Sequence, residues 1–257
     1  MSDRPLVLVT NDDGIESFYL ETLARALAAY FRVVVAAPLR EQSWIGRAMS
    51  RHRAVALSQT EVAGHPAWAI DGTPSDCVNL ALGHLLPERP QMVVSGINIG
   101  HNTTIPLLYS SGTIAGALEG AHWNLPAIAV SQAVSAPHYA QVVASKGRDL
   151  PTEVAQSLQA AADLAARFAI DRLTSENPDL IVHNLNFPAN TTTETDTRKT
   201  IPARVQLGSL FTPGELGAYA FQYPKGAYAP SHQLSDRTAL ETGSASWTPL
   251  NFSQIGG

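Results

Sequence analysis

The chain has 257 residues, of which 45% are hydrophobic and 15% charged, and its formal net charge is -5. This composition is typical of a globular enzyme with a sizeable core, and the negative balance argues against binding to a nucleic-acid polymer. Cys77 is the only cysteine, which excludes an internal disulfide, and no segment resembles a secretory signal or a membrane anchor. We therefore expect a cytoplasmic protein that does not bind membranes.

A short apolar stretch near the amino terminus, Leu6–Val9, predicts a fully buried strand that leads into Asn11, Asp12, Asp13 and Gly14. Burying two neighbouring carboxylates costs several kcal/mol per ion unless a positive charge compensates them. A bound metal ion would supply that charge. The alternative is a polar turn in which one of the two aspartates caps the next helix.

The following segments continue the pattern of a strand followed by a helix. Leucines recur at helical spacing over 16–30, and the apolar run 32–38 predicts a second buried strand. The polar segment 39–50 then places Ser43 just beyond a strand end, although an ordinary loop serine has the same signature. Residues 51–70 alternate weakly and predict a short hairpin in the main sheet.

The run Asp71–Val78 predicts the start of another helix. Thr73 can cap this helix, Pro74 suits its first position, and Asp76 lies in its first turn. Cys77 falls on the apolar face, so we interpret it as a packed core residue rather than a nucleophile.

A third strand end also carries polar groups. The apolar run 91–94 leads into the loop Ser95–Asn102, where small residues and the amides of Asn98 and Asn102 let a ligand approach closely. His101 in this loop is interpreted as a solvated side chain.

A helix predicted over 114–121 opens with Ser111, Gly112 and Thr113. The free N–H groups of its first turn suit a phosphate, and the alternative is a helix that is simply well capped. A strand, a long amphipathic helix and a last core strand follow at 127–131, 151–170 and 179–186. The last strand ends with Asn184 and Asn186, which we interpret as structural.

Strands that alternate with helices predict an α/β fold with a mostly parallel, doubly wound sheet. We place this catalytic core at residues 1–188, and the threonine-rich, Gly/Pro-broken segment 189–257 is interpreted as a hairpin-rich extension, an oligomerisation arm that returns to the core. The polar loops at the carboxyl ends of the strands can converge at one edge of such a sheet. Two carboxylates, a hydroxyl and an amide oxygen form a set that suits Mg²⁺ or Mn²⁺.

The ordered set of motifs resembles the survival-protein nucleotidases, the SurE family. The motifs that carry the resemblance are Val9–Ile15, Ala37–Pro38 with Gln42, Ser43 and Gly46, Gly72–Val78, Val94–Asn98 with Gly100 and Asn102, Ser111–Thr113 with Glu119 and Gly120, Asn184–Pro188, and Asp236, Ala239, Leu240, Gly243 and Thr248–Leu250.

The resemblance implies a Rossmann-like phosphatase that removes phosphate from nucleoside 5′- or 3′-monophosphates, with polyphosphate as a substrate of some members. It also implies homodimers or homotetramers that exchange the carboxyl-terminal hairpin, here from about residue 190 onward. One divalent ion per subunit, Mg²⁺ or Mn²⁺, would be held by Asp12, Asp13, Ser43 and Asn98.

In our mechanistic hypothesis, the cation neutralises the phosphate and polarises the attacking water, and Asp12 or Asp13 positions or deprotonates that water. The donors predicted to hold the phosphate oxygens are Asn11, Asn102, Ser111, Gly112 and Thr113.

Two departures from the family pattern lie near the expected pocket. Trp44 replaces a small residue and would add an aromatic wall, and an extra residue leaves open whether Ser110 or Ser111 faces the phosphate. The sequence also allows two other interpretations. A haloacid-dehalogenase-type phosphatase needs Asp-x-Asp after the first strand, where this chain has adjacent aspartates. A non-catalytic nucleotide-binding module is the other, but the Gly-x-Gly-x-x-Gly fingerprint is missing from the first turn.

Overall fold

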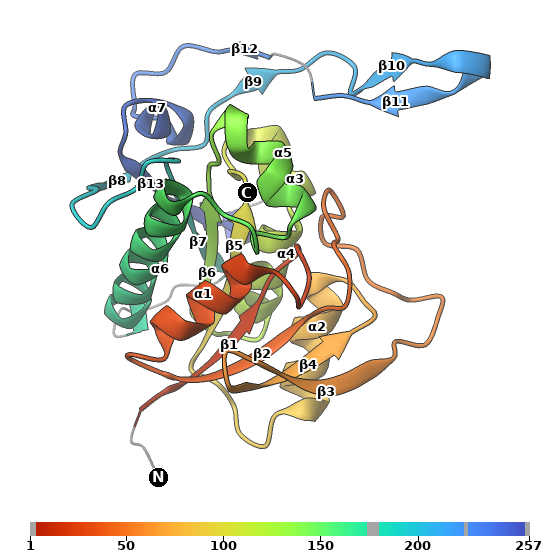
Figure 1. The fold of residues 1–257 in the computed structure, drawn as a ribbon, viewed down its shortest axis with the longest axis vertical. Helices are drawn as coiled ribbons and strands as arrows, with labels where there is room; N and C mark the ends of the chain where they lie inside the picture. Colours follow the sequence, from red (N-terminus) through yellow and green to blue (C-terminus); the bar gives the residue numbers. More distant parts are fainter. Residues whose placement is uncertain (1–3, 174–179, 224–225, 255–257) are drawn as a thin grey trace.

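The computed structural model describes residues 4–173, 180–223 and 226–254, so Asp179, Pro224 and Lys225 lie outside the described ranges. Helices cover both faces of a nine-stranded sheet, and the predicted α/β class is confirmed (Figure 1). The strands are β1 (Leu6–Thr10), β2 (Arg32–Pro38), β3 (Leu57–Val62), β4 (His65–Ile70), β5 (Met92–Ile99), β6 (Ala127–Gln132), β7 (Ile181–Phe187), β8 (Thr197–Lys199), β9 (Val205–Gln206), β10 (Phe211–Pro213), β11 (Tyr219–Phe221), β12 (Ala227–Tyr228) and β13 (Ala245–Asn251). The helices are α1 (Phe18–Leu27), α2 (Pro74–Leu80), α3 (Ile105–Ser110), α4 (Gly112–His122), α5 (Ala136–Ala144), α6 (Thr152–Leu173) and α7 (Asp236–Glu241), with a π-helix η1 (Ala81–Leu85) and 3₁₀ turns η2 (Glu215–Gly217) and η3 (Phe252–Gln254).

The order of the strands in the sheet locates the ligand crevice. The order is β3-β4-β2-β1-β5-β6-β7-β13-β8, and the strands from β4 through β7 run parallel. From β1 the chain first builds outward through β2 and β4, and it then returns to β5 and builds in the opposite direction. The reversal therefore falls between β1 and β5. In open parallel sheets the ligand crevice forms at such a point, beyond the carboxyl ends of the strands.

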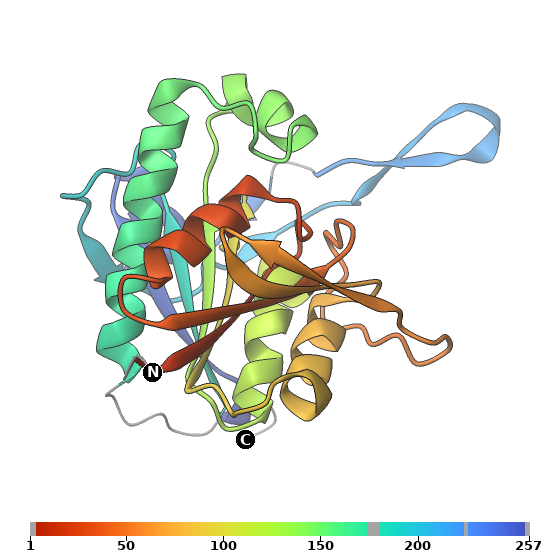
Figure 2. The same ribbon diagram turned by 60° about the horizontal axis from the view of Figure 1, so that its bottom comes forward.

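The core lies on both faces of this sheet because successive side chains of a strand point to opposite faces. Val7 and Val9 pack in a cluster with α1 and α6, whereas Leu6 and Leu8 pack in a second cluster with α2. The helix α4 packs against α2 and over β5 and β6. Figure 2 shows these helices on the two sides of the sheet. Full burial of one such aliphatic side chain stabilises the fold by about 1.5–3 kcal/mol.

Local sequence signals set the beginning of α2 as predicted. The Thr73 hydroxyl oxygen accepts the N–H of Asp76 at 3.1 Å, and the Asp76 carboxylate accepts the N–H of Thr73 at 2.9 Å. This reciprocal capping box satisfies two N–H groups that would otherwise lack partners. Cys77 is fully buried in the cluster beside β1, so its interpretation as a core residue is confirmed.

Several element boundaries differ from the prediction. The edge hairpin exists within 51–70, and its antiparallel strands are β3 and β4. The short helices α3 and α5 were not predicted, because segments of six and nine residues are too short to show a clear helical periodicity. In the described part of the chain, no helix combines the length and the apolar character needed to cross a bilayer.

The carboxyl-terminal segment returns to the core sheet. β13 pairs antiparallel with β7, and β8 pairs parallel with β13, so the core sheet continues beyond the strand predicted over 179–186. The hairpin β10–β11 instead projects from the body of the molecule (Figure 1). The division at residue 188 and the role of the extension in oligomerisation stay predictions.

Candidate active site

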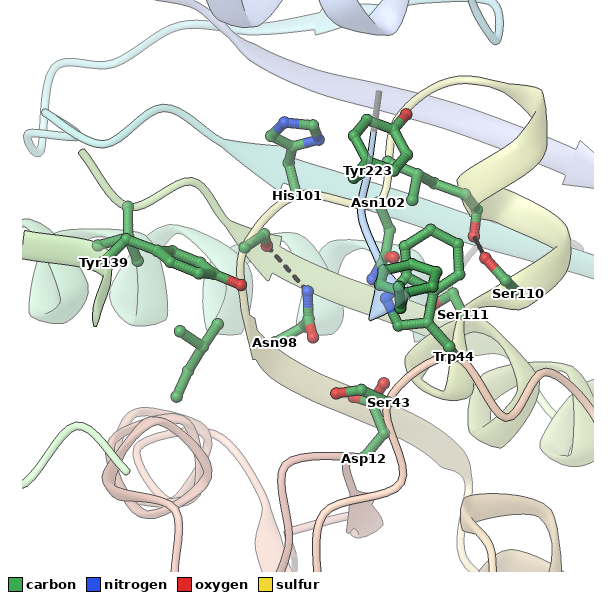
Figure 3. Close-up of a pocket in the computed structure, with 15 residues that line it drawn as sticks. Asp12, Ser43, Trp44, Asn98, His101, Asn102, Ser110, Ser111, Tyr139 and Tyr223 are labelled. Atoms are coloured by element: carbon green, nitrogen blue, oxygen red, sulfur yellow. Dashed lines mark hydrogen bonds between the residues drawn. The ribbon is translucent and has the colours of Figure 1, made fainter. Parts of the chain in front are cut away.

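A cavity of about 420 Å³ opens beyond the carboxyl ends of β1 and β5, at the reversal of strand order (Figure 3). Asp12, Ser43 and Asn98 line it together, although they come from three separate strand–loop units. The other walls come from α3, from α5 and from the segment that follows β11. The tertiary structure thus brings three of the four predicted metal ligands to one cavity.

Asp12 is held rigidly at the floor of this cavity. The carboxylate is 3% exposed, and its Oδ1 accepts a hydrogen bond from the Thr113 hydroxyl at 2.6 Å. Gly112 lies directly against it, because a Cβ at that position would lie 2.7 Å from the Asp12 Cβ. Burial raises the pKa of Asp12 to about 6, against the opposing effect of the Thr113 hydrogen bond.

Asp13 points to a different part of the site. Its Oδ2 accepts the backbone N–H of Ile99 at 3.0 Å, and the residue borders a smaller cavity of about 120 Å³ that it shares with Glu41 and Ser43. Burial, followed by the charge of Asp12, raises the pKa of Asp13 well above its usual value. Ser43 lines both cavities and so connects the two aspartates.

Ser43 and Asn98 both keep an oxygen available for a ligand. The Ser43 hydroxyl donates to Glu41 Oε1 at 2.6 Å, which leaves lone pairs on Ser43 Oγ. The Asn98 Nδ2 donates to the carbonyl of Gly100 at 2.9 Å, which leaves Oδ1 of the amide (Figure 3). A register shift between Ser95 and Asn98 interrupts the pairing of β5 with β6 and re-aims this segment.

Only glycine fits at position 96 within that irregularity. Gly96 has φ of +140°, and a Cβ there would lie 2.3 Å from the Val130 carbonyl oxygen. The sequence signal for this part of the site is therefore the glycine two residues before Asn98.

Two of the five predicted phosphate-binding residues line the cavity, namely Asn102 and Ser111. Ser111 caps α4 by accepting the N–H of Ile114 at 3.1 Å, and its hydroxyl proton remains free to donate. Ser110 also lines the cavity, but its hydroxyl lies toward the Pro106 carbonyl. Ser111 is thus the better donor to an anion.

The other predicted phosphate-binding residues have different contacts in the structure. Asn11 is fully buried, and its Nδ2 donates to the Gly14 carbonyl at 3.0 Å. Thr113 is also fully buried and donates its hydroxyl to Asp12, while Gly112 packs against the same carboxylate. These three residues shape the turn and position Asp12, and none of them lines the main cavity.

Asn102 is fixed by the asparagines at the end of β7. Its backbone N–H donates to Asn186 Oδ1 at 2.7 Å, and its carbonyl accepts from Asn184 Nδ2 at 2.8 Å. Its own amide donates to Ser131 at 2.9 Å. Asn184 and Asn186 therefore have the structural role predicted for them, and they hold the loop that borders the cavity.

His101 is not the solvated side chain that we expected. Its Nε2 lies 2.9 Å from Nη1 of Arg237, and its Nδ1 lies 3.0 Å from the Thr103 hydroxyl. Because a guanidinium only donates, Nε2 must accept, and the imidazole is neutral with its proton on Nδ1. Burial, together with the charge of Arg237, lowers the pKa of His101 to about 4.

Sequence reasoning missed the aromatic side chains that line the cavity, apart from Trp44. They are Tyr139 on α5, Phe221 on β11, and Tyr223. None lies in a chemistry-bearing motif, and only the folded chain brings them beside Asp12.

The donor set fits a hard cation through oxygens alone. The two aspartates receive a hydroxyl and backbone N–H groups, and in the described residues no lysine or arginine pairs with either carboxylate. The same residues include no group of three or more His, Cys, Asp or Glu that could hold a metal ion. A cation here would therefore rely on Ser43 and Asn98 beside the two carboxylates, and it would compensate their buried charge.

The fold and the site define an α/β protein with a ligand site at the switch point of a Rossmann-like sheet. The family described as "Survival protein SurE" matches residues 7–207, and the chain belongs to this family. A solved structure, "Crystal Structure of Sure Protein from Aquifex aeolicus", superimposes with a TM-score of 0.73 at 26% identity, covering 96% of this chain and 93% of that chain.

Curated relatives carry the name "5'-nucleotidase SurE". The protein of Moorella thermoacetica is 48% identical over 50% of this chain, and that of Nostoc sp. is 38% identical over 71%. The matched stretches span 50% and 63% of those two relatives, which is less than two thirds of their length. The relative from Methanosarcina mazei is 36% identical over 78% of this chain and 73% of its own length.

Proposed function

We propose that the protein is a divalent-metal-dependent phosphomonoester hydrolase that acts on nucleoside 5′- or 3′-monophosphates. The observation that carries this proposal is the convergence of Asp12, Ser43 and Asn98 on one cavity, with Asp13 beside it. The relatives named 5'-nucleotidase support a nucleotide as the substrate.

In this proposal Asp12, Asp13, Ser43 and Asn98 hold one Mg²⁺ or Mn²⁺ ion. The buried, uncompensated carboxylates support this set, because a cation would favour their charged forms. When bound, the ion supplies positive charge and Lewis acidity at the phosphoryl oxygens.

The chain's own residues bind and orient the substrate. The Ser111 hydroxyl lies on the cavity wall, and we assign it to a non-bridging phosphate oxygen. The N–H groups of Asn102 already donate to Asn186, Thr113 and Ser131, so we assign Asn102 to holding the loop that borders the phosphate. Asp12 lines the same cavity, so we assign it, rather than Asp13, to the proton of the attacking water. Thr113 and Gly112 keep the Asp12 carboxylate in place.

The assembly is part of the proposal. We propose a homodimer or homotetramer joined through the segment 189–257, since the hairpin β10–β11 projects from the body and exposes Phe211 and Tyr219. Light scattering of the full chain, compared with Phe211→Ser, tests whether this hairpin holds subunits together.

Phosphate release from nucleoside 5′- and 3′-monophosphates and from polyphosphate tests the function directly. We expect turnover to stop with EDTA and to return with Mn²⁺ or Mg²⁺. Asp13→Asn should lower kcat by two or more orders of magnitude with an unchanged circular-dichroism spectrum. The matched control is Asp71→Asn, because Asp71 pairs with Arg53 on the surface of the edge hairpin.

Metal-independent turnover, or normal activity of Asp13→Asn, would contradict the proposal. Tight nucleotide binding without phosphate release in the presence of metal would instead indicate a binding module. A trapped aspartyl-phosphate would indicate the haloacid-dehalogenase type of chemistry.

A further inference from the structure

We propose that Trp44, Phe221 and Tyr223 form an aromatic wall that binds the base of the substrate and selects phosphomonoesters carrying such a ring. This inference rests on the proposed hydrolase function and names the part of the substrate that determines specificity. Failure of the aromatic wall and failure of the phosphatase activity give different experimental results.

The three rings gather at one side of the cavity although they come from distant parts of the chain. The Trp44 and Phe221 ring centroids lie 4.9 Å apart with an interplanar angle of 65°, and the Trp44 and Tyr223 centroids lie 5.9 Å apart. All three residues line the cavity that also holds Asp12 and Ser43. Trp44 and Tyr223 are labelled in Figure 3. Trp44 contacts Phe221 in an edge-to-face geometry and Tyr223 in a tilted one, and ring surface remains open for a ligand.

That open surface is large for aromatic side chains. Trp44 is 41% exposed, Phe221 48% and Tyr223 42%. Planar bases stack on such surfaces with little dependence on base identity, because every base has a π-face. The wall therefore matches the class of nucleosides rather than one particular base.

Trp44 is held in place by its backbone. Its φ is +61°, a conformation that non-glycine residues rarely adopt. The loop is fixed on both sides of it, because the Gln42 N–H donates to the Asp12 carbonyl at 2.7 Å and the Gly46 N–H donates to the Ser110 carbonyl at 2.9 Å. Unfavourable backbone conformations persist where the surroundings impose them, and they cluster at ligand sites. The backbone that carries the indole is thus fixed next to Ser43.

The charge of the cavity also favours a monophosphate with an aromatic group. Among the described residues that line it, none is lysine or arginine, and His101 is neutral because its Nε2 accepts from Arg237. A polyphosphate chain would find no cationic side chain beyond the phosphate subsite. A nucleoside, by contrast, can place its base on the aromatic wall while its phosphate reaches the polar floor. The volume of about 420 Å³ lies within the range of small-molecule sites.

The test compares two substrates that share the sugar phosphate and differ in the base, adenosine 5′-monophosphate and ribose 5-phosphate. For Trp44→Ala we expect kcat/KM toward the nucleotide to fall by about 10- to 100-fold, the loss of one stacking contact. The value for ribose 5-phosphate should stay unchanged, and Trp44→Phe should retain most of the preference. Tyr30→Ala is the matched control, since Tyr30 is an exposed aromatic residue just after α1 and does not line the cavity.

A binding measurement keeps the inference independent of turnover. Calorimetric titration of adenosine 5′-monophosphate in EDTA should show weaker binding to Trp44→Ala than to the wild type or to Tyr30→Ala. If Trp44→Ala does not fold, Phe221→Ala replaces it, because Phe221 lies on the projecting hairpin.

The outcomes separate the two proposals. If Trp44→Ala slows both substrates equally and leaves nucleotide binding unchanged, the aromatic wall is wrong and the phosphatase function stands. If the wild type releases no phosphate from either substrate but loses nucleotide affinity on Trp44→Ala, the wall is supported and the proposed function fails. Efficient polyphosphate hydrolysis that exceeds nucleotide hydrolysis would overturn the selectivity that we infer.

Discussion

The pair formed by His101 and Arg237 makes the stability of the fold depend on pH. Nε2 of His101 accepts from the Arg237 guanidinium at 2.9 Å, so protonation of the imidazole would place two cations in contact. Burial and Arg237 lower the pKa of His101 from 6.5 to about 4, although Glu241 acts in the opposite direction. The unfolded chain therefore binds this proton more tightly than the folded chain does.

The sign and size of the effect follow from these two pKa values. His101 contributes its full stability above its unfolded pKa of 6.5, and the contribution is lost as the pH falls toward 4. Between pH 8 and pH 5 the loss of unfolding free energy is at most about 2 kcal/mol, because only the pH range below 6.5 contributes, at about 1.4 kcal/mol per pH unit. Partial contact of the imidazole with solvent makes the loss smaller. His183, whose pKa is also lowered to about 4 by burial, acts in the same direction. Asp236 beside Arg237 has a raised pKa and acts in the opposite direction near pH 4.

Urea unfolding at pH 8 and pH 5 measures the effect, and the comparison with His101→Gln isolates it. Glutamine can accept from Arg237 but does not titrate, so the variant should lose less stability between the two pH values than the wild type, by about 1–2 kcal/mol. His52→Gln, an exposed loop substitution, serves as the control. If His101→Gln and the wild type lose the same free energy, His101 is not held neutral in the folded protein.

Two further predictions concern residues that position the site or its scaffold. Gly112→Ala should lower activity at least about tenfold with the fold intact, because the new Cβ would lie 2.7 Å from the Asp12 Cβ and 3.2 Å from the Gln42 carbonyl oxygen. Phosphate release at saturating metal measures this effect. Normal kinetics of the variant would show that the loop moves without cost to Asp12. Thr73→Ala should cost about 0.5–2 kcal/mol in urea unfolding, because it removes the acceptor for the Asp76 N–H and the hydroxyl that donates to the Ala48 carbonyl at 2.7 Å. A loss smaller than that of an exposed strand substitution such as Thr60→Ala would contradict the capping role.

Local patterns predicted the elements whose signals are contained in a few neighbouring residues. The buried run of β1 and the capping box at Thr73 are examples, since burial on both faces and the first turn of a helix each leave a local signature. β13 left no such signature. Its seven residues mix polar, aromatic and proline positions, and its place in the sheet depends on pairing with β7 across more than fifty residues of chain.

The features of the candidate site also divide into those that the sequence indicates and those that only the fold places. The adjacent aspartates and the strand-end position of Ser43 are visible in the sequence, because chemistry needs those residue types at the ends of parallel strands. Which carboxylate faces which cavity is not visible, since adjacent residues at a strand end point in different directions. Asp12 therefore lines the main cavity and Asp13 the smaller one.

The sequence by itself determined the α/β class, the family resemblance and the identity of the oxygen donors, because these depend on residue type and short-range order. Only the tertiary structure decided that Thr113 serves Asp12, that His101 is neutral beside Arg237, and that Phe221 and Tyr223 stand beside Trp44. Each of those contacts joins segments far apart in the chain. These contacts form only once the folded sheet has brought the segments together, so no local pattern of residues encodes them.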